Sequence, residues 1–218
     1  MWCHLCKKLS DTTLCPTCEE AIRKTGYESL FTHRCPVCGQ PVLDATYACP
    51  FCNEGILSYG PYGKTLASLI KCFKFGGDRS LTPLLSGLYL PLIKRVTSPI
   101  IIPIPCSIEG YRRRGFDQSM VIASYLARME GFAYLSLFNR HKGMQHKFLS
   151  KEQRLGEQAI QLTHSKKKHH HFVHFLSAGY TAVLLDDVKA TGATSRRARE
   201  LLESHFGCKA TIIVLADV

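Results

Sequence analysis

The segment formed by residues 181–195, TAVLLDDVKATGATS, restricts the possible folds more than any other part of the chain. Its apolar run, residues 182–185, is typical of a buried strand. The run stops at two adjacent carboxylates, Asp186 and Asp187, and after a short loop residues 196–205 have the pattern of a helix. A strand, an acidic pair, a glycine-containing loop and a helix start, in this order, predict an α/β fold with a phosphate and ribose site.

The predicted phosphate loop consists of small and hydroxyl-bearing residues: Ala190, Thr191, Gly192, Ala193, Thr194 and Ser195. Its N–H groups and the positive end of the helix dipole can hold a phosphate, with hydrogen bonds donated by the three hydroxyls. The two carboxylates stand at the carboxyl end of the strand, where open α/β sheets bind ligands, and can accept hydrogen bonds from ribose hydroxyls. An ordinary strand–loop–helix unit with an Asp-rich turn is the alternative interpretation.

This ordered pattern resembles the phosphoribosyl diphosphate (PRPP) signature of type I phosphoribosyltransferases. The resemblance implies that Asp186 and Asp187 contact the ribose 2′- and 3′-hydroxyls and that residues 190–194 cradle the 5-phosphate. It also implies Mg²⁺ bridging the diphosphate and the ribose hydroxyls. One departure is Ala190, where the family often has Thr or Ser; the backbone donors of the loop remain.

Cysteine spacing is the second informative feature. Eight of the 11 cysteines form four Cys-x-x-Cys pairs: Cys3 and Cys6, Cys15 and Cys18, Cys35 and Cys38, Cys49 and Cys52. Each pair places two thiolates on one tight turn, so two pairs complete a tetrahedral four-sulfur Zn²⁺ site, and the eight predict two structural sites. We expect the first pair to join the second and the third to join the fourth, with a cross-braced arrangement as the alternative.

A disulfide-rich secreted domain is the competing interpretation of these cysteines. Residues 1–4 show neither a charged leader region nor an apolar signal core, and regular Cys-x-x-Cys spacing is typical of metal sites. Cys72, Cys106 and Cys208 are isolated in the sequence, and we interpret them as free thiols in a reducing compartment.

The domain organisation follows from length and pattern. A chain of 218 residues can hold a small zinc-binding module, predicted at 1–55, and one ordinary domain, predicted at 56–218. Because no run of 18 apolar residues exists, we expect a chain that does not span a membrane. Apolar spacing predicts helices at 64–75, 82–95 and 118–129 and strands at 99–104, 133–138 and 210–216. Strands alternating with helices predict a parallel sheet in a three-layer domain.

Further motifs resemble the ComF family over nearly the whole chain. They are residues 59–64 (YGPYGK), 70–77 (IKCFKFGG), 112–118 (RRRGFDQ) and 145–150 (QHKFLS) followed by Arg154. That family joins a cysteine-rich zinc module to a phosphoribosyltransferase-type domain and is associated with natural competence. The usual Asn is replaced here by Asp117, a carboxylate near the expected anionic ligand, which we expect either to face that ligand or to cap the helix that begins at Gln118.

The charge balance is compatible with an anionic partner. The formal net charge is +11, and residues 140–171 contain eight Lys or Arg against two acids. This composition predicts a mobile cationic loop that includes the Lys/His run at 166–171. Such a loop could track single-stranded DNA or close over PRPP; the alternative is a solvated loop without a specific ligand. A separate arginine cluster after the first core strand suits a diphosphate or a DNA backbone: Arg112, Arg113 and Arg114.

Taken with the resemblance, these features predict a cytoplasmic PRPP-binding protein of the ComF type that handles incoming single-stranded DNA in natural transformation. The enzymatic hypothesis is a pyrophosphate-releasing phosphoribosyltransferase whose acceptor the sequence does not reveal. Two alternatives stay open. One is a non-catalytic single-stranded DNA-binding module on the same fold, and the other is an adaptor whose zinc module docks on a DNA translocase or another competence protein.

Overall fold

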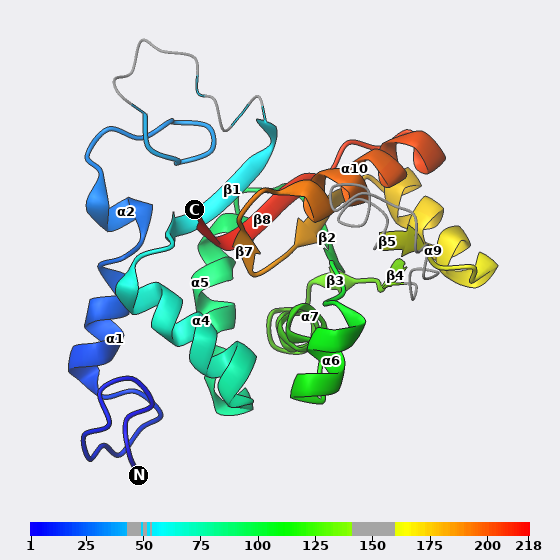
Figure 1. Ribbon diagram of the computed structural model, residues 1–218. Coiled ribbons are helices and arrows are strands. Elements are labelled where there is room, and N and C mark those ends of the chain that lie inside the picture. Colours follow the sequence, from blue (N-terminus) through cyan, green and yellow to red (C-terminus); the bar gives the residue numbers. More distant parts are fainter. Residues whose placement is uncertain (43–48, 50–51, 53, 141–159) are drawn as a thin grey trace, which may run out of the picture. The chain divides into compact units, whose positions relative to one another are not determined.

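The computed structural model describes residues 1–42, 49, 52, 54–140 and 160–218 (Figure 1). The architecture is mixed α/β with a mostly parallel central sheet, as predicted. The chain divides into two compact units. The first unit comprises Met1–Arg95, Asp187–Ala190 and Ile213–Val218, and the second unit comprises Val96–Asp186 and Thr191–Ile212. The domain boundary predicted after residue 55 falls within the first unit and stays a prediction.

The cysteine-rich part of the first unit contains two short helices, α1 (Pro16–Arg23) and α2 (Tyr27–Leu30). Pro16 occupies the first position of α1, where its missing N–H leaves no intrahelical bond unmade. Ile22 of α1 is fully buried, and α1 packs on the longer helix α4 (Lys64–Gly76). The cysteine-rich part is therefore anchored on the remainder of its own unit.

The rest of the first unit is built from β1 (Ile56–Pro61), α4, the 3₁₀ turn η1 (Arg79–Leu81), α5 (Thr82–Ile93) and the short strand β7 (Val188–Lys189), with most of β8 (Thr211–Asp217). Strand β7 pairs in parallel with β8, and β1 is also a neighbour of β8 in the sheet. The predicted helices at 64–75 and 82–95 are confirmed. Pro83 lies in the first turn of α5, as expected, but the chain also accepts Pro91 inside that helix.

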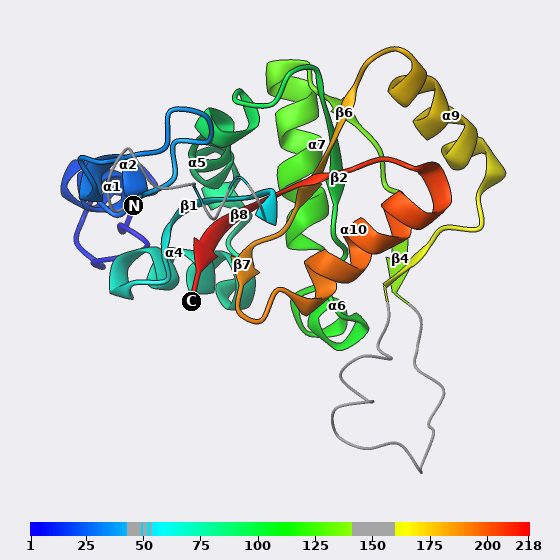
Figure 2. The same cartoon turned by 90° about the horizontal axis from the view of Figure 1, so that it is seen from above.

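The core of the second unit is a parallel arrangement of three strands in the order β6 (Thr181–Leu185), β2 (Pro99–Pro103) and β3 (Ala133–Tyr134). All four apolar residues at the end of β6 are buried, which is typical of a strand in a parallel sheet. Helices α6 (Ile108–Arg114) and α7 (Gln118–Glu130) follow β2, and α10 (Ala193–Phe206) begins within the predicted phosphate loop. Figure 2 shows α7 running along β2, on which it packs.

Two sequence predictions about the second unit are wrong. The single strand expected at 133–138 is split: β3 pairs with β2, whereas β4 (Phe138–Arg140) pairs antiparallel with β5 (Ile160–Leu162). The Lys/His run is not a loop but the beginning of α9 (Lys166–Ser177), capped by the Ser165 hydroxyl. Phe172 is buried and Phe175 and Leu176 are half-buried, an apolar spacing that favours a helix.

Residues 141–159, which carry most of the predicted cationic loop, lie outside the described residues. Among the residues that are described, no helix has the length and apolar character needed to cross a bilayer.

Candidate functional site

The carboxyl ends of β2 and β6 meet at one edge of the sheet in the second unit. The two strands are in register from Pro99↔Thr181 to Pro103↔Leu185, and the Ile104 N–H donates to the Leu185 carbonyl at 2.9 Å. Strand β3 pairs with one edge of β2, and β6 pairs with its opposite edge. The order in which the chain adds strands to the sheet therefore reverses at β2. Crevices outside the carboxyl ends of strands at such reversals are the usual ligand sites of open α/β sheets. Asp186 follows β6 at this edge.

Asp187, the second carboxylate of the acidic pair, is fixed within the first unit. Its Oδ1 accepts a hydrogen bond from the Val188 N–H at 2.9 Å, and its Oδ2 lies 2.8 Å from the ammonium of Lys74 on α4. The two side chains are only 13% and 26% exposed, so this ion pair is largely shielded from water. The Asp187 carbonyl also accepts the Leu215 N–H at 3.0 Å. Local sequence gives no signal of this contact, because the two residues are far apart in the chain.

The predicted phosphate loop, residues 190–195, leads into the first turn of α10. Gly192 caps α10 with φ +69°, a left-handed conformation that a residue with a side chain adopts at a cost. The loop is braced internally by hydrogen bonds: the buried Ser195 hydroxyl donates to the Gly192 carbonyl at 3.1 Å, and Thr191 Oγ1 accepts the Ala193 N–H at 3.3 Å. Ser195 therefore holds the loop, while Thr194 is half-buried and Ala190 and Thr191 are exposed.

The predicted arginine cluster lies on α6, which begins at Ser107 with the Ser107 hydroxyl accepting the Gly110 N–H at 3.0 Å. Arg112 and Arg113 are exposed, whereas Arg114 is half-buried and folds back over Gly110. A Cβ added at Gly110 would come within 2.6 Å of an Arg114 guanidinium nitrogen, so the glycine makes room for this side chain. The three arginines thus do not share one environment.

Asp117 has the capping role that was one of its two predicted interpretations. Its Oδ1 accepts the Met120 N–H at 3.1 Å, which caps α7, and its Oδ2 accepts the Cys106 N–H at 2.6 Å. The carboxylate therefore ties the start of α7 to the loop that follows β2. Both of its oxygens carry backbone hydrogen bonds, which compensate its negative charge.

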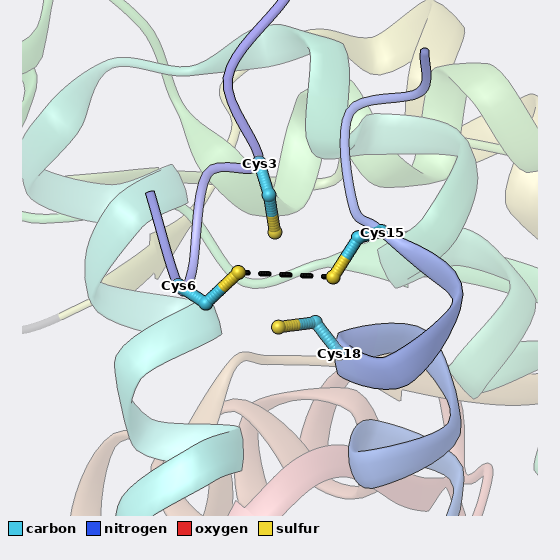
Figure 3. A group of neighbouring side chains, drawn as sticks. All are labelled: Cys3, Cys6, Cys15 and Cys18. Carbon is cyan, nitrogen blue, oxygen red and sulfur yellow. Dashed lines mark hydrogen bonds between the residues drawn. The ribbon is translucent and has the colours of Figure 1, made fainter. Parts of the chain in front are cut away.

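The eight paired cysteines gather into two clusters, the first with the second pair and the third with the fourth. In each cluster the four sulfur atoms lie within 4.8 Å of one another: Cys3, Cys6, Cys15 and Cys18; Cys35, Cys38, Cys49 and Cys52. Figure 3 shows the four side chains of the first cluster converging, with Cys15 and Cys18 at the start of α1. This is the sequential grouping that we expected, rather than the cross-braced one.

The sulfur contacts fit metal ligation and not disulfides. The Sγ atoms of Cys6 and Cys15 are 3.7 Å apart, and those of Cys38 and Cys49 are 3.4 Å apart, well beyond a covalent S–S bond of about 2.05 Å. Burial opposes ionisation of Cys3, but backbone N–H groups, those of Cys15 and Cys6 foremost, lower its pKa to about 6. Burial and the neighbouring thiols raise the pKa of Cys18 to about 12. Four thiolates this close repel one another, and a cation such as Zn²⁺ removes that penalty.

The first cysteine cluster is tied to the end of α4 by two contacts within the first unit. The Cys72 thiol donates to the His4 carbonyl at 3.7 Å, and His4 Nδ1 pairs with the Asp78 carboxylate just beyond α4. The His4 side chain is 31% exposed. Lys74 lies near the same end of α4. This end of the helix therefore contacts both the first cysteine cluster and Asp187.

Comparison with known proteins gives three similar chains, and no family model matches the sequence. Competence protein ComFC of Streptococcus pneumoniae is 26% identical over 203 residues, covering 88% of this chain and 82% of the relative. The resemblance to the ComF family is confirmed. Competence protein ComFC of Bacillus subtilis is also 26% identical, over 210 residues (88% and 79%). DNA utilization protein YhgH of Salmonella typhimurium is 25% identical over 219 residues (92% and 89%).

Proposed function

We propose that this protein handles DNA taken up in natural competence and that it binds PRPP at the acidic pair and phosphate loop. The observation that carries the proposal is the position of Asp186 directly after β6, at the sheet edge where β2 also ends, with the glycine loop and the start of α10 following in the chain. The printed names of the relatives, competence protein and DNA utilization protein, support the biological part.

The residues at this edge suit the parts of PRPP. Amide N–H groups of residues 190–195 and the α10 dipole would hold the 5-phosphate, and Asp186 and Asp187 would accept hydrogen bonds from the ribose hydroxyls. The guanidinium groups of Arg112, Arg113 and Arg114 are candidates for the diphosphate. Lys74 offsets one carboxylate charge, which lowers the repulsion between the acidic pair and an anionic ligand.

In the enzymatic form of the proposal, an acceptor nucleophile bonds to the anomeric carbon while the bond to the diphosphate oxygen breaks. The diphosphate leaves with the bonding electron pair, and the acceptor loses its proton. Bound Mg²⁺ would supply charge neutralisation on the diphosphate; the carboxylates and hydroxyls present are oxygen ligands of the kind that this ion prefers. The chain's own residues position the ribose and hold the phosphate, so no protein nucleophile is needed.

The remaining parts of the proposal concern the environment of the protein. Two Cys₄ clusters suit structural Zn²⁺ and a reducing compartment such as the cytoplasm. Single-stranded DNA is the proposed macromolecular ligand, since the chain is strongly basic, and a DNA translocase or another competence protein is the proposed protein partner.

Calorimetric titration of PRPP into the full-length, zinc-loaded protein in Mg²⁺ tests the ligand. We expect saturable binding to the natural protein and its loss in the Asp186→Asn/Asp187→Asn double variant, which keeps side-chain size but removes both charges. If the loop recognises a phosphate group alone, the protein will bind inorganic phosphate with the same affinity as PRPP. Equal PRPP binding by both proteins, or by neither, contradicts the proposed ribose role of the acidic pair.

A further inference from the structure

A pocket of about 670 Å³ lies within the second unit, and none of the residues assigned above to PRPP is among those that line it. Its walls come from the loop after β2, from α6, from the start of α7, from the segment joining β3 to β4 and from β4 itself. The volume is in the range of small-ligand sites, about 300 to 1,000 Å³. Neither the acidic pair nor the phosphate loop is among the described residues that line it.

Three hydrogen bonds of two side chains, Arg140 and Asp117, fix the walls of this pocket before any ligand arrives. The Arg140 Nε–H donates to the Pro105 carbonyl at 2.7 Å, which joins β4 to the loop after β2. On the other side Asp117 joins the same loop to α7 through the N–H groups of Cys106 and Met120. Because these contacts are made within the protein, the pocket is preformed and little ordering is needed on binding.

The lining has apolar walls and a polar edge. Ile108, Met120 and buried Phe138 supply apolar surface, and burial raises the pKa of the Cys106 thiol, which therefore stays neutral. The polar edge carries Asn139, whose amide is exposed, and the Arg140 guanidinium, a planar group with further N–H donors beyond Nε. A flat heterocycle with donors and acceptors on its rim matches this combination.

Tyr111 lines the pocket and keeps 53% of its surface exposed. Its ring is available for stacking. On α6 the pocket-lining residues Ile108 and Tyr111 are three positions apart, and exposed Arg112 is four positions from Ile108. Residues at these spacings are neighbours on a helix surface, so Arg112 neighbours the pocket-lining Ile108 on α6.

We propose that this pocket receives one unpaired nucleobase, stacked on Tyr111, with the adjoining phosphate beside Arg112. The base belongs to a single-stranded DNA chain in the first instance, and a free mononucleotide offers the same chemistry. The proposal rests on the DNA-handling part of the proposed function and not on the PRPP site.

The test separates base contacts from phosphate contacts. Binding of the full-length, zinc-loaded protein to a short fluorescent oligothymidylate is compared, by anisotropy, with binding to an abasic strand of equal length and charge. The natural protein is expected to prefer the strand with bases by at least about fivefold, the lower range of one stacked base. Tyr111→Ala removes that preference and leaves abasic binding unchanged, whereas Tyr111→Phe keeps it.

Two controls make the result specific. Tyr125→Ala on α7, a half-buried tyrosine outside the pocket, is expected to leave the preference intact. Arg112→Gln is expected to weaken binding to both oligonucleotides alike. It should also reduce the slope of log affinity against log salt concentration by about one. A natural protein that binds both strands equally, or a Tyr111→Ala variant that retains the preference, overturns the proposal.

The source of the base is distinguished by replacing the oligonucleotide with thymidine monophosphate. Binding of the mononucleotide that Tyr111→Ala abolishes supports the pocket as a free-nucleotide site, and binding of the strand alone supports the DNA site. The Asp186→Asn/Asp187→Asn variant keeps the base preference if the two sites are separate. Loss of PRPP binding with the base preference intact would therefore contradict only the PRPP proposal.

Discussion

The ammonium of Lys74, near the end of α4, lies 2.8 Å from Oδ2 of Asp187, the carboxylate that follows Asp186 in the acidic pair. Both groups belong to the first unit, and water reaches little of either side chain. A carboxylate in this position that lost its partner would remain poorly solvated. Lys74 therefore fixes the position and offsets the charge of Asp187.

Replacing Lys74 by methionine is expected to destabilise the protein by roughly 1 to 2 kcal/mol, between the values for exposed and fully buried pairs. For a chain of this size that corresponds to a Tm lower by about 2 to 8 °C. Thermal unfolding of the zinc-loaded protein measures the change. Lys71→Met, an exposed lysine on the same helix, is the matched control and should be close to neutral. Equal effects of the two substitutions would show that the ion pair contributes nothing.

Zinc content tests the two cysteine clusters. The purified protein should contain two zinc ions per chain, one for each cluster. Cys3→Ser and Cys35→Ser should each remove one ion, measured by atomic absorption, because a hydroxyl does not replace a thiolate ligand of Zn²⁺. Cys208→Ser, outside both clusters, should keep both ions. Chelation should unfold the cysteine-rich part, since metal binding supplies on the order of 10 kcal/mol in such sites. A metal-free protein that stays folded there would contradict the zinc assignment.

Asp117 should tolerate amide replacement better than truncation. Asp117→Ala loses the bonds to both Met120 and Cys106 and is expected to cost about 1 to 2 kcal/mol. In Asp117→Asn the amide oxygen can still cap α7, but its NH₂ group faces the Cys106 N–H, so the loss should be smaller. Thermal unfolding of the two variants checks this order. Equal losses of stability in the two variants would mean that one of the two hydrogen bonds does not contribute to stability.

The Tyr27 hydroxyl donates to the Asp217 carboxylate, which links α2 to the end of β8. Burial, together with this carboxylate, raises the pKa of Tyr27 well above its ordinary value of 10.0. Because the folded-state pKa is the higher one, the contribution is fully present below pH 10 and is lost as the pH rises toward the folded-state pKa. Tyr27→Phe should therefore cost about 1 kcal/mol at neutral pH, and the difference should shrink only in alkaline solution. Denaturant titrations across this range measure it; a difference that disappears at neutral pH contradicts the assignment.

The sequence predicts best those parts of the fold where a local residue pattern is compatible with only one structure. The apolar run before Asp186 forms a strand, and the paired cysteine spacing leads to two clusters. The charged run at 166–171 was misinterpreted because its lysines and histidines hide the apolar spacing that continues through Phe172 and Phe175. Strand β4 was joined to β3 because the alternation of the pattern does not reveal that Phe138 pairs with Leu162 instead.

The contacts of the candidate site were less predictable because they join residues far apart in the sequence. Nothing near Lys74 indicates that it meets Asp187, and the pocket lined by Tyr111 and Arg140 depends on how α6 and β4 pack. The capping role of Asp117 was one of the two roles that the sequence predicted for it, since a cap is decided by the residues that follow it.

Hydrogen–deuterium exchange of the full-length protein, with and without PRPP and Mg²⁺, tests the central claim most directly. A 5-phosphate held by loop amides must slow their exchange. The account predicts protection of residues 186–195 and the first turn of α10, absent in the Asp186→Asn/Asp187→Asn variant, with the cysteine clusters unchanged. PRPP-dependent protection confined to other segments, or binding with no protection at 186–195, would contradict it.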